Sequence, residues 1–296
     1  VLCAAELAGG ALAAALRRAA LAAEGAWRSV EERPPPRAAP LVVEFLGTLA
    51  LALVAGVAAG AGACAHSTLG TAIALAALTF TLPMPAPCLL LNPAASFASA
   101  LAGYLAPGVA LARAAVQCAA GAVAGIACRW LQQAPLQSDA VRHGVKLVDP
   151  KEGAEEFALV GLLVYSALAL APAAATPGPA EGRARLSLAL GTCTAIGGLS
   201  LGAATGGLLN PALSLARSVA GLGATPDPCA WAQLSLWQLG GGLLAVSALR
   251  ATRPRAAGAA EEPEDAAAGT YAAEFEGTFV LAFLVACCSL LPGGPA

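Results

Sequence analysis

Two short segments of the sequence carry the same three residues, and their types suggest a way to bind a neutral solute. They are two Asn-Pro-Ala triplets, whose asparagines are 118 residues apart: Asn92, Pro93, Ala94, Asn210, Pro211 and Ala212. Asn is a favoured helix N-cap and Pro a favoured first helical residue, so each triplet predicts a helix start. A helix N-terminus carries about half a positive charge. If two such ends met, they would offer amide groups to a solute oxygen while repelling cations.

The sequence around the triplets has the composition of a membrane protein. Of 296 residues, 58% are hydrophobic and 11% are charged, against about 25% charged in a soluble domain. Residues 45–112, 157–180 and 186–216 contain no Asp, Glu, Lys or Arg. Uncharged apolar runs of about 20 residues are long enough to cross a bilayer. The alternative, an Ala-rich soluble helical protein, is disfavoured because soluble helices need a polar face.

The elements that must position the triplets are apolar helices. Six segments are long enough to span a membrane: Val42–Gly62, Ser67–Leu82, Val109–Leu131, Glu156–Ala175, Leu186–Ala204 and Trp231–Leu249. Two more, Pro93–Tyr104 and Pro211–Ala220, are too short to span, and each follows a motif asparagine. We therefore predict an all-α membrane protein with six transmembrane helices and two re-entrant half-helices.

The two halves of the chain resemble each other. The segment "EFLGTLALALV" begins at Glu44, and "EFALVGLLVYS", which begins at Glu156, opens the fourth span. Three spans separate the copies, so the second half must run inverted across the membrane. Inverted repeats with interrupted segments at matching positions indicate a pathway at the repeat interface. If the chain begins in the cytosol, ten Lys and Arg fall on that side and five on the far side, which favours both ends of the channel domain inside.

The sequence also contains a second, longer-range repeat. The segment at 271–288 repeats that at 41–58, and residues 6–16 resemble 238–248. We expect four parts: a helix and linker at 1–40 that resemble the end of a preceding unit, a channel domain at 41–250, a polar linker at 251–270 and the first helix of a following unit at 271–296. The alternative is two unrelated terminal anchors in an Ala-rich sequence.

On these residues the chain resembles the aquaporin, or major intrinsic protein, family over about 41–250. The resemblance covers the six spans, both Asn-Pro-Ala motifs, Glu44, Glu156 and Gln117. It implies a passive channel for water and small neutral solutes such as glycerol or hydrogen peroxide, in the lipid bilayer. It also implies a homotetramer, or an intramolecular assembly of tandem units. The glutamates and Gln117 would brace the pore-lining loops, although each glutamate could instead only end its helix at the interface.

The expected selectivity filter departs from the family pattern. The family usually has Arg after the second triplet, and this chain has Leu213. By spacing from the asparagines, the other filter positions are Ala72, Gly198 and Gly207. A filter of these four residues would be wide and apolar, and Leu213 resembles the unorthodox, superaquaporin-like branch. Arg217, one turn later, could turn back toward the pore, although it is expected to extend to the surface.

Other classes of function fit the sequence less well. It shows no metal-ligand cluster, no need for a cofactor, no nucleic-acid-binding pattern and no catalytic arrangement, so an enzyme is not expected. A secondary transporter would need an intramembrane ionisable residue to couple an ion. The remaining alternative is a non-conducting structural membrane protein that keeps the aquaporin fold.

Overall fold

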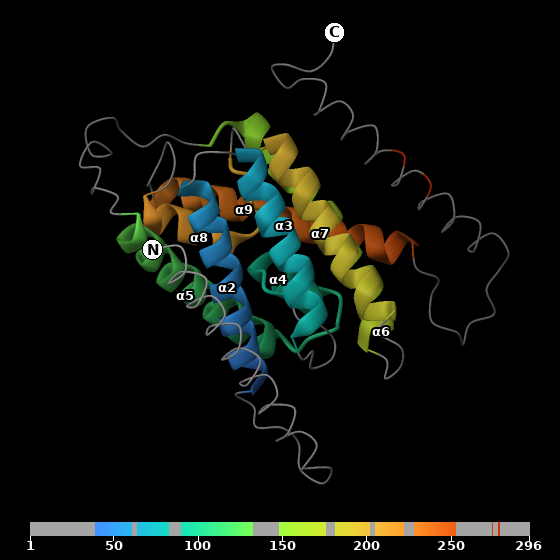
Figure 1. Cartoon of the computed structure of the whole chain (residues 1–296). Coiled ribbons are helices and arrows are strands. Elements are labelled where there is room, and N and C mark those ends of the chain that lie inside the picture. Colours follow the sequence, from blue (N-terminus) through green and yellow to red (C-terminus); the bar gives the residue numbers. More distant parts are fainter. Residues whose placement is uncertain are drawn as a thin grey trace, which may run out of the picture.

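The structure is a computed structural model that describes residues 39–60, 64–82, 90–132, 148–175, 181–201, 205–221 and 228–252, with Glu274 and Thr278. These ranges contain eight helices and no strand (Figure 1): α2 (Ala39–Gly60), α3 (Cys64–Thr81), α4 (Pro93–Leu101), α5 (Pro107–Leu131), α6 (Pro150–Ala175), α7 (Glu181–Leu201), α8 (Pro211–Ala220) and α9 (Pro228–Thr252). The helix and linker expected at 1–40 and the helix expected at 271–296 fall outside the described residues, apart from Ala39, Pro40, Glu274 and Thr278.

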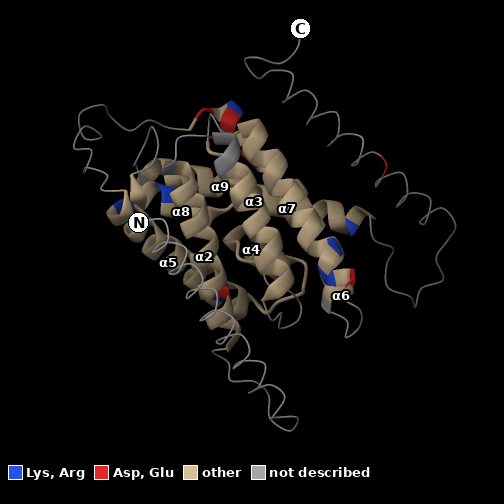
Figure 2. Cartoon of the chain, in the orientation of Figure 1, with Lys and Arg blue, Asp and Glu red and all other residues tan. Residues whose placement is uncertain are grey.

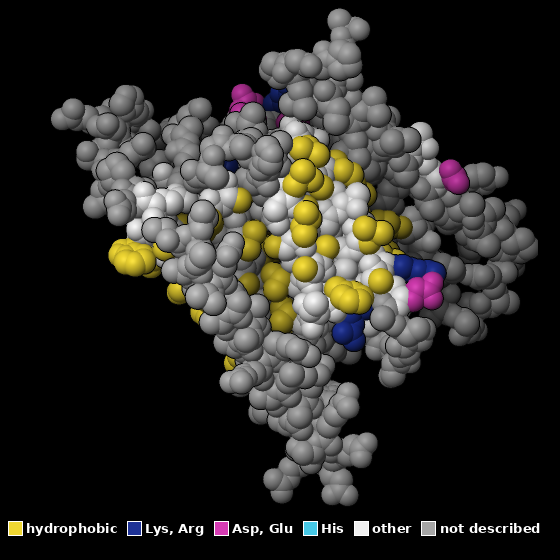
Figure 3. All heavy atoms as spheres, viewed as in Figure 1, with side chains coloured by type: hydrophobic (Ala, Val, Ile, Leu, Met, Phe, Trp, Pro, Cys, Tyr) yellow, Lys and Arg dark blue, Asp and Glu magenta, His cyan; other side chains and the backbone are white. Residues whose placement is uncertain are grey.

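Six helices provide the membrane spans, as the sequence predicts. Helices α2, α5, α6, α7 and α9 are long and apolar enough to cross a bilayer, and α3, with 18 residues, is the sixth. Large hydrophobic side chains are exposed on α3 and α7, where Ile73 and Leu188 are 68% and 71% exposed. Hydrophobic side chains are spread over the face of the molecule that Figure 3 shows. Long stretches of these helices carry no charge, and charged residues gather near helix ends (Figure 2). The chain is therefore an integral, multi-pass membrane protein.

The two short helices are the predicted half-helices. Helix α4 has 9 residues and α8 has 10, so each is about 15 Å long, half of the hydrocarbon core. Helix α8 has the predicted bounds. Helix α4 ends three residues before the expected Tyr104, because Gly103 has a φ of 80° and the Tyr104 N–H turns back to the Ser99 carbonyl at 2.8 Å.

The inverted repeat is also confirmed. Helix α2 packs on α5 as α6 packs on α9, and α3 and α7 pack against each other. Equivalent details recur in both halves: Thr79 donates to the Leu75 carbonyl on α3, and Thr194 donates to the Leu190 carbonyl on α7. Both α5 and α9 begin at a proline, two or three residues before the predicted starts, because proline is favoured at the first helical position.

Glycines let the half-helices approach the long helices closely. A Cβ on Gly121 of α5 would collide with the Ala212 carbonyl oxygen at the start of α8. A Cβ added to the matching Gly242 of α9 would lie 3.2 Å from the Ala94 carbonyl oxygen of α4. The first turn of each half-helix therefore rests directly on a neighbouring backbone.

Candidate functional site

The two half-helices meet at their N-termini. Each motif asparagine caps its own helix: Asn92 Oδ1 accepts from the Ala94 N–H, and Asn210 Oδ1 from the Ala212 N–H, both at 2.9 Å. Each also reaches the opposite loop. Asn92 Nδ2 donates to the Leu209 carbonyl at 2.9 Å, and Asn210 Nδ2 donates to the Leu91 carbonyl at 2.8 Å. The structure thus brings together two motifs that lie far apart in the sequence.

The leucines before the asparagines have an unusual backbone. Leu91 has a φ of 47° and Leu209 a φ of 51°, in the left-handed region that favours glycine, at a cost of about 1–3 kcal/mol each. Both side chains are fully buried. The conformation aims each carbonyl at the opposite asparagine, so the surrounding hydrogen bonds hold the strained backbone in place.

Glu44 on α2 holds the loop before α4. Its carboxylate is buried and accepts from the Leu91 N–H at 3.0 Å and the Leu90 N–H at 3.3 Å. Gln117 on α5 donates to it at 2.8 Å. The Ser96 hydroxyl of α4 in turn donates to Gln117 Oε1 at 3.2 Å. This network joins α2, α5 and the first half-helix.

Arg113 completes this network as a buried cation. Its guanidinium lies 3.3 Å from Glu44 Oε1, and the two side chains are 3% and 1% exposed. An uncompensated charge is costly inside a membrane protein, and a direct ion pair compensates Glu44. Arg113 and Glu44 lie on different helices and far apart in the sequence, so the sequence gave no sign of this pair.

Glu156 on α6 holds the loop before α8 with a different set of donors. The Thr205 hydroxyl donates to its carboxylate, and Gln238 Nε2 donates at 3.0 Å. Thr205 also accepts from the Gly207 N–H at 3.2 Å.

Gln238 is the counterpart of Gln117, and the sequence analysis missed it. Both glutamines are fully buried and donate to a glutamate. Gln238 also contacts the Ser214 hydroxyl of α8 at 3.2 Å, as Gln117 contacts Ser96 of α4. Aligning α5 with α9 from their first prolines would have paired the two glutamines.

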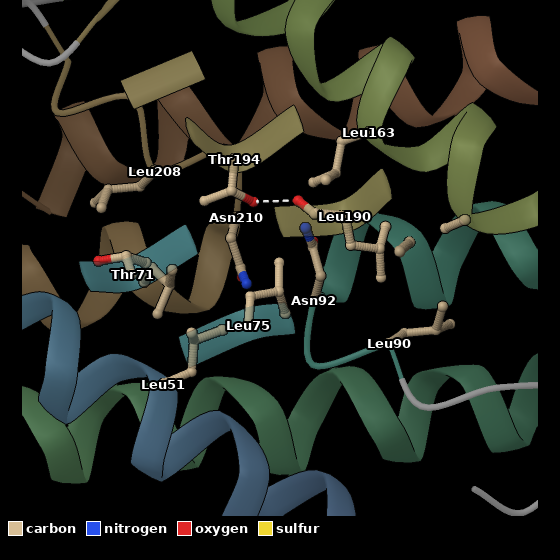
Figure 4. Close-up of a pocket in the computed structure, with 13 residues that line it drawn as sticks. Leu51, Thr71, Leu75, Leu90, Asn92, Leu163, Leu190, Thr194, Leu208 and Asn210 are labelled. Atoms are coloured by element: carbon tan, nitrogen blue, oxygen red, sulfur yellow. Dashed lines mark hydrogen bonds between the residues drawn. The ribbon is translucent and has the colours of Figure 1, made fainter. Parts of the chain in front are cut away.

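A narrow cavity lies where the half-helices meet (Figure 4). Its volume is about 20 Å³, enough for a single water molecule. The lining residues come from α2, α3, α4, α6, α7 and α8 and from the loops before the half-helices: Leu51, Thr71, Leu75, Leu90, Asn92, Ala95, Leu163, Ala167, Leu190, Thr194, Leu208, Asn210 and Leu213. None of these 13 side chains is charged or aromatic. Each asparagine amide has two N–H groups, so one bond to the opposite loop leaves a donor for the cavity.

The lining is nearly symmetric between the halves. Leucines occupy matching positions on α2 and α6, on α3 and α7, and in the two loops: Leu51 with Leu163, Leu75 with Leu190, and Leu90 with Leu208. The third residue of each half-helix breaks the match, because Ala95 on α4 corresponds to Leu213 on α8. The wall is therefore bulkier on the α8 side.

The residues expected to form the filter lie in three places. Leu213 lines the cavity. Gly207 packs on the α7 backbone at Gly197 and Gly198, and a Cβ on Gly198 would meet Thr68. Ala72 lies one turn further along α3, where its carbonyl oxygen would lie 3.1 Å from a Cβ added to Gly191. Thr68 thus lies against Gly198, and Ala72 lies against Gly191.

Arg217 does not extend away from the site as the sequence suggested. Its Nη1 donates to the Thr205 carbonyl at 3.3 Å. The same nitrogen fills the space where a side chain on Gly206, with a φ of 91°, would lie. Arg217 therefore contacts the loop before α8. Among the described residues no group of three His, Cys, Asp or Glu side chains could hold a metal ion.

The fold is similar to that of a solved membrane channel. The X-ray structure of the aquaglyceroporin from Plasmodium falciparum matches with a TM-score of 0.56 and 17% sequence identity, covering 72% of this chain and 95% of that chain. No protein-family model matches the sequence, and no curated protein matches it. The likeness establishes an aquaporin-like fold for the chain.

Proposed function

We propose that this chain is a passive membrane channel that conducts water and small neutral solutes between the tips of α4 and α8. The observation that carries the proposal is the crossed pair of bonds between Asn92, Asn210 and the opposite loops, at one shared cavity. The cavity has room for a water molecule, and asparagine amides can donate to its oxygen. The aquaporin-like fold supports the same conclusion.

The channel would exclude cations without an arginine in its wall. The N-termini of α4 and α8 both face the cavity, and their partial positive charges disfavour a cation there. None of the lining side chains offsets that field with a negative charge. This barrier would replace the one that the family's usual arginine supplies at the position of Leu213.

Glu44, Glu156 and Gln117 would act by fixing the loops, and Gln238 would join them. Both glutamates are buried and accept from loop residues. Because the loops carry the asparagines, a displaced loop would misplace the amide groups. We assign these four residues a bracing role and no contact with the permeant.

Solute size would be set beside Leu213. The loop between α7 and α8 packs closely on α7, where Gly207 contacts Gly198, and Gly198 contacts Thr68 of α3. We propose these three residues, with Leu213 and Ala72, as the filter region. Water fits the cavity as it stands, whereas glycerol would need leucine side chains to change rotamer. We expect glycerol and hydrogen peroxide to pass because leucine side chains can move and no fixed cation blocks them.

The proposal is tested by swelling of proteoliposomes under water and glycerol gradients. Wild-type protein should raise both fluxes above those of empty vesicles. Leu213→Arg places a cation in the lining and should reduce glycerol flux more than water flux, while the control Leu213→Met keeps the size and should change little. Equal loss of both fluxes in Leu213→Arg, or water flux with complete rejection of glycerol in the wild type, would contradict the filter assignment.

One observation favours a non-conducting structural protein as the second candidate. Seven of the 13 lining residues are leucines, and a hydrophobic constriction can close a pore by excluding water. A folded preparation whose flux equals that of empty vesicles would favour this second candidate.

The assembly and orientation are proposals too. We propose that the channel domain spans about 41–250, with both of its ends in the cytosol, and that it works as a homotetramer or as one unit of a tandem array. Further Asn-Pro-Ala motifs in the flanking gene sequence would support the array, and their absence would exclude it.

A further inference from the structure

We infer that each half of the chain positions the asparagine of the other half, with Leu91 and Leu209 as the connecting residues. Glu44, in the first half, fixes Leu91, and the Leu91 carbonyl accepts from Asn210, in the second half. Glu156 fixes the loop that carries Leu209, whose carbonyl accepts from Asn92. The inference deepens the proposed function and rests on it, because it concerns the amide groups that would meet the permeant.

The first connection runs from Glu44 through Leu91 to Asn210, and a hydrogen bond joins each pair of residues. Glu44 Oε2 accepts from the Leu91 N–H at 3.0 Å, and Asn210 Nδ2 donates to the carbonyl of the same residue at 2.8 Å. Leu91 is therefore held at both of its backbone polar groups. Its φ of 47° makes this possible, since the N–H faces α2 while the carbonyl faces α8.

The second connection runs through Thr205. The Thr205 hydroxyl donates to Glu156 and accepts from the N–H of Gly207, two residues before Leu209. Leu209 has a φ of 51°, and its carbonyl accepts from Asn92 Nδ2 at 2.9 Å. Each asparagine keeps its own helix capped through Oδ1. The cap thus fixes the oxygen from within one half, and the opposite loop fixes the nitrogen from the other half.

A substitution of the glutamate in one half should therefore disturb the asparagine of the other half. Replacing Glu44 by Leu removes both carboxylate oxygens, so the Leu90 and Leu91 N–H groups lose their acceptors. Leu91 then loses the bond that holds its strained backbone, and its carbonyl moves away from Asn210. The disturbance at Asn210 should exceed that at Asn92, although Asn92 is the nearer residue in the sequence. Glu156→Leu should have the reverse effect.

The composition of the chain makes this measurable. Asn92 and Asn210 are the only two asparagines among the 296 residues. Protein labelled with ¹⁵N in asparagine side chains alone, in lipid bilayers, gives one NH₂ group for each motif. Asn92→Asp and Asn210→Asp assign the two signals by the loss of one or the other.

We expect Glu44→Leu to move the bonded side-chain proton of Asn210 upfield more than that of Asn92, and Glu156→Leu to move that of Asn92 more. Glu181→Leu, at an exposed glutamate, should move neither. Because Glu44→Leu leaves Arg113 without its carboxylate, Glu44→Leu/Arg113→Met provides a second variant without the buried charge. A larger shift at the asparagine of the same half, equal shifts at both, or no shift at either would overturn the inference. The spectra report hydrogen bonds rather than flux, so failure of the channel proposal would appear separately in vesicle swelling.

Discussion

The two halves of the molecule solve the same problem with different electrostatics. In the first half a guanidinium contacts Glu44 directly, and the carboxylate accepts from two backbone N–H groups and Gln117. In the second half the donors to Glu156 are the Thr205 hydroxyl and the Gln238 side-chain amide. The two halves therefore share the geometry of the loops and differ in how they hold the carboxylate.

The position of the cation shows this most clearly. Aligned by their first prolines, α5 has Arg113 where α9 has Leu234, one turn before the two glutamines. The second half has its arginine on the half-helix instead, where Arg217 contacts the Thr205 carbonyl. One cation thus compensates a carboxylate, and the other holds a loop backbone.

Removing the buried cation should have the largest effect. Arg113→Met leaves Glu44 buried without its partner, which costs about 3–5 kcal/mol. Thermal unfolding in detergent should show a large loss of stability. The matched control Leu234→Met conserves volume in the second half and should cost less than about 1.5 kcal/mol. Similar losses in both variants would show that the two halves do not differ in this way.

Replacing either buried glutamine, Gln117 or Gln238, should cause the next largest loss of stability. Gln117→Leu and Gln238→Leu each remove a donor to a buried carboxylate, worth about 1.5–3 kcal/mol. Gln238→Leu should cost more, because Glu156 lacks the direct guanidinium contact that remains on Glu44. Unfolding of the two variants under one condition measures the difference, and a greater loss from Gln117→Leu would reverse our ranking.

Substitutions of the two glycines that contact the half-helices, Gly121 and Gly242, should differ least in their effect on stability. Gly121→Ala drives a methyl group into the Ala212 carbonyl oxygen, at a cost of roughly 1–3 kcal/mol. Gly242→Ala meets the Ala94 carbonyl oxygen at 3.2 Å, so a small shift accommodates it. Unfolding temperature and water flux should both fall further in Gly121→Ala, whereas equal losses would mean that α4 and α8 are packed equally tightly.

Much of this arrangement could be predicted from the sequence. Uncharged runs gave six spans, and Asn-Pro marked the start of both half-helices to the residue, because N-capping and first-turn proline are local effects. The inverted repeat followed from the matching segments at Glu44 and Glu156. The ends of the long helices were less accurate, since polar first turns such as that of α6 continue the helix beyond the apolar run.

The details of the site required the fold. The left-handed backbone of Leu91 and Leu209 has no local signal, because neither residue favours it. The partners of Arg113 and Thr205 lie on other helices or loops, so spacing could not identify them. Spacing gave Ala72 for the filter, which stays a prediction, and it could not show that the packing of α3 on α7 sets Thr68 against Gly198.

The central claim is that solutes cross the membrane through the cavity between Asn92 and Asn210, and Thr71→Cys tests it most directly. Thr71 lines that cavity, so a small thiol-reactive reagent should block water flux in Thr71→Cys vesicles, and a reductant should restore it. Leu111→Cys, at a side chain that is 72% exposed on α5, controls for labelling elsewhere, and the wild type controls for the native cysteines. We predict a reversible block in Thr71→Cys alone. Water flux that persists after the introduced thiol is fully modified, or wild-type flux no higher than that of empty vesicles, would contradict the account.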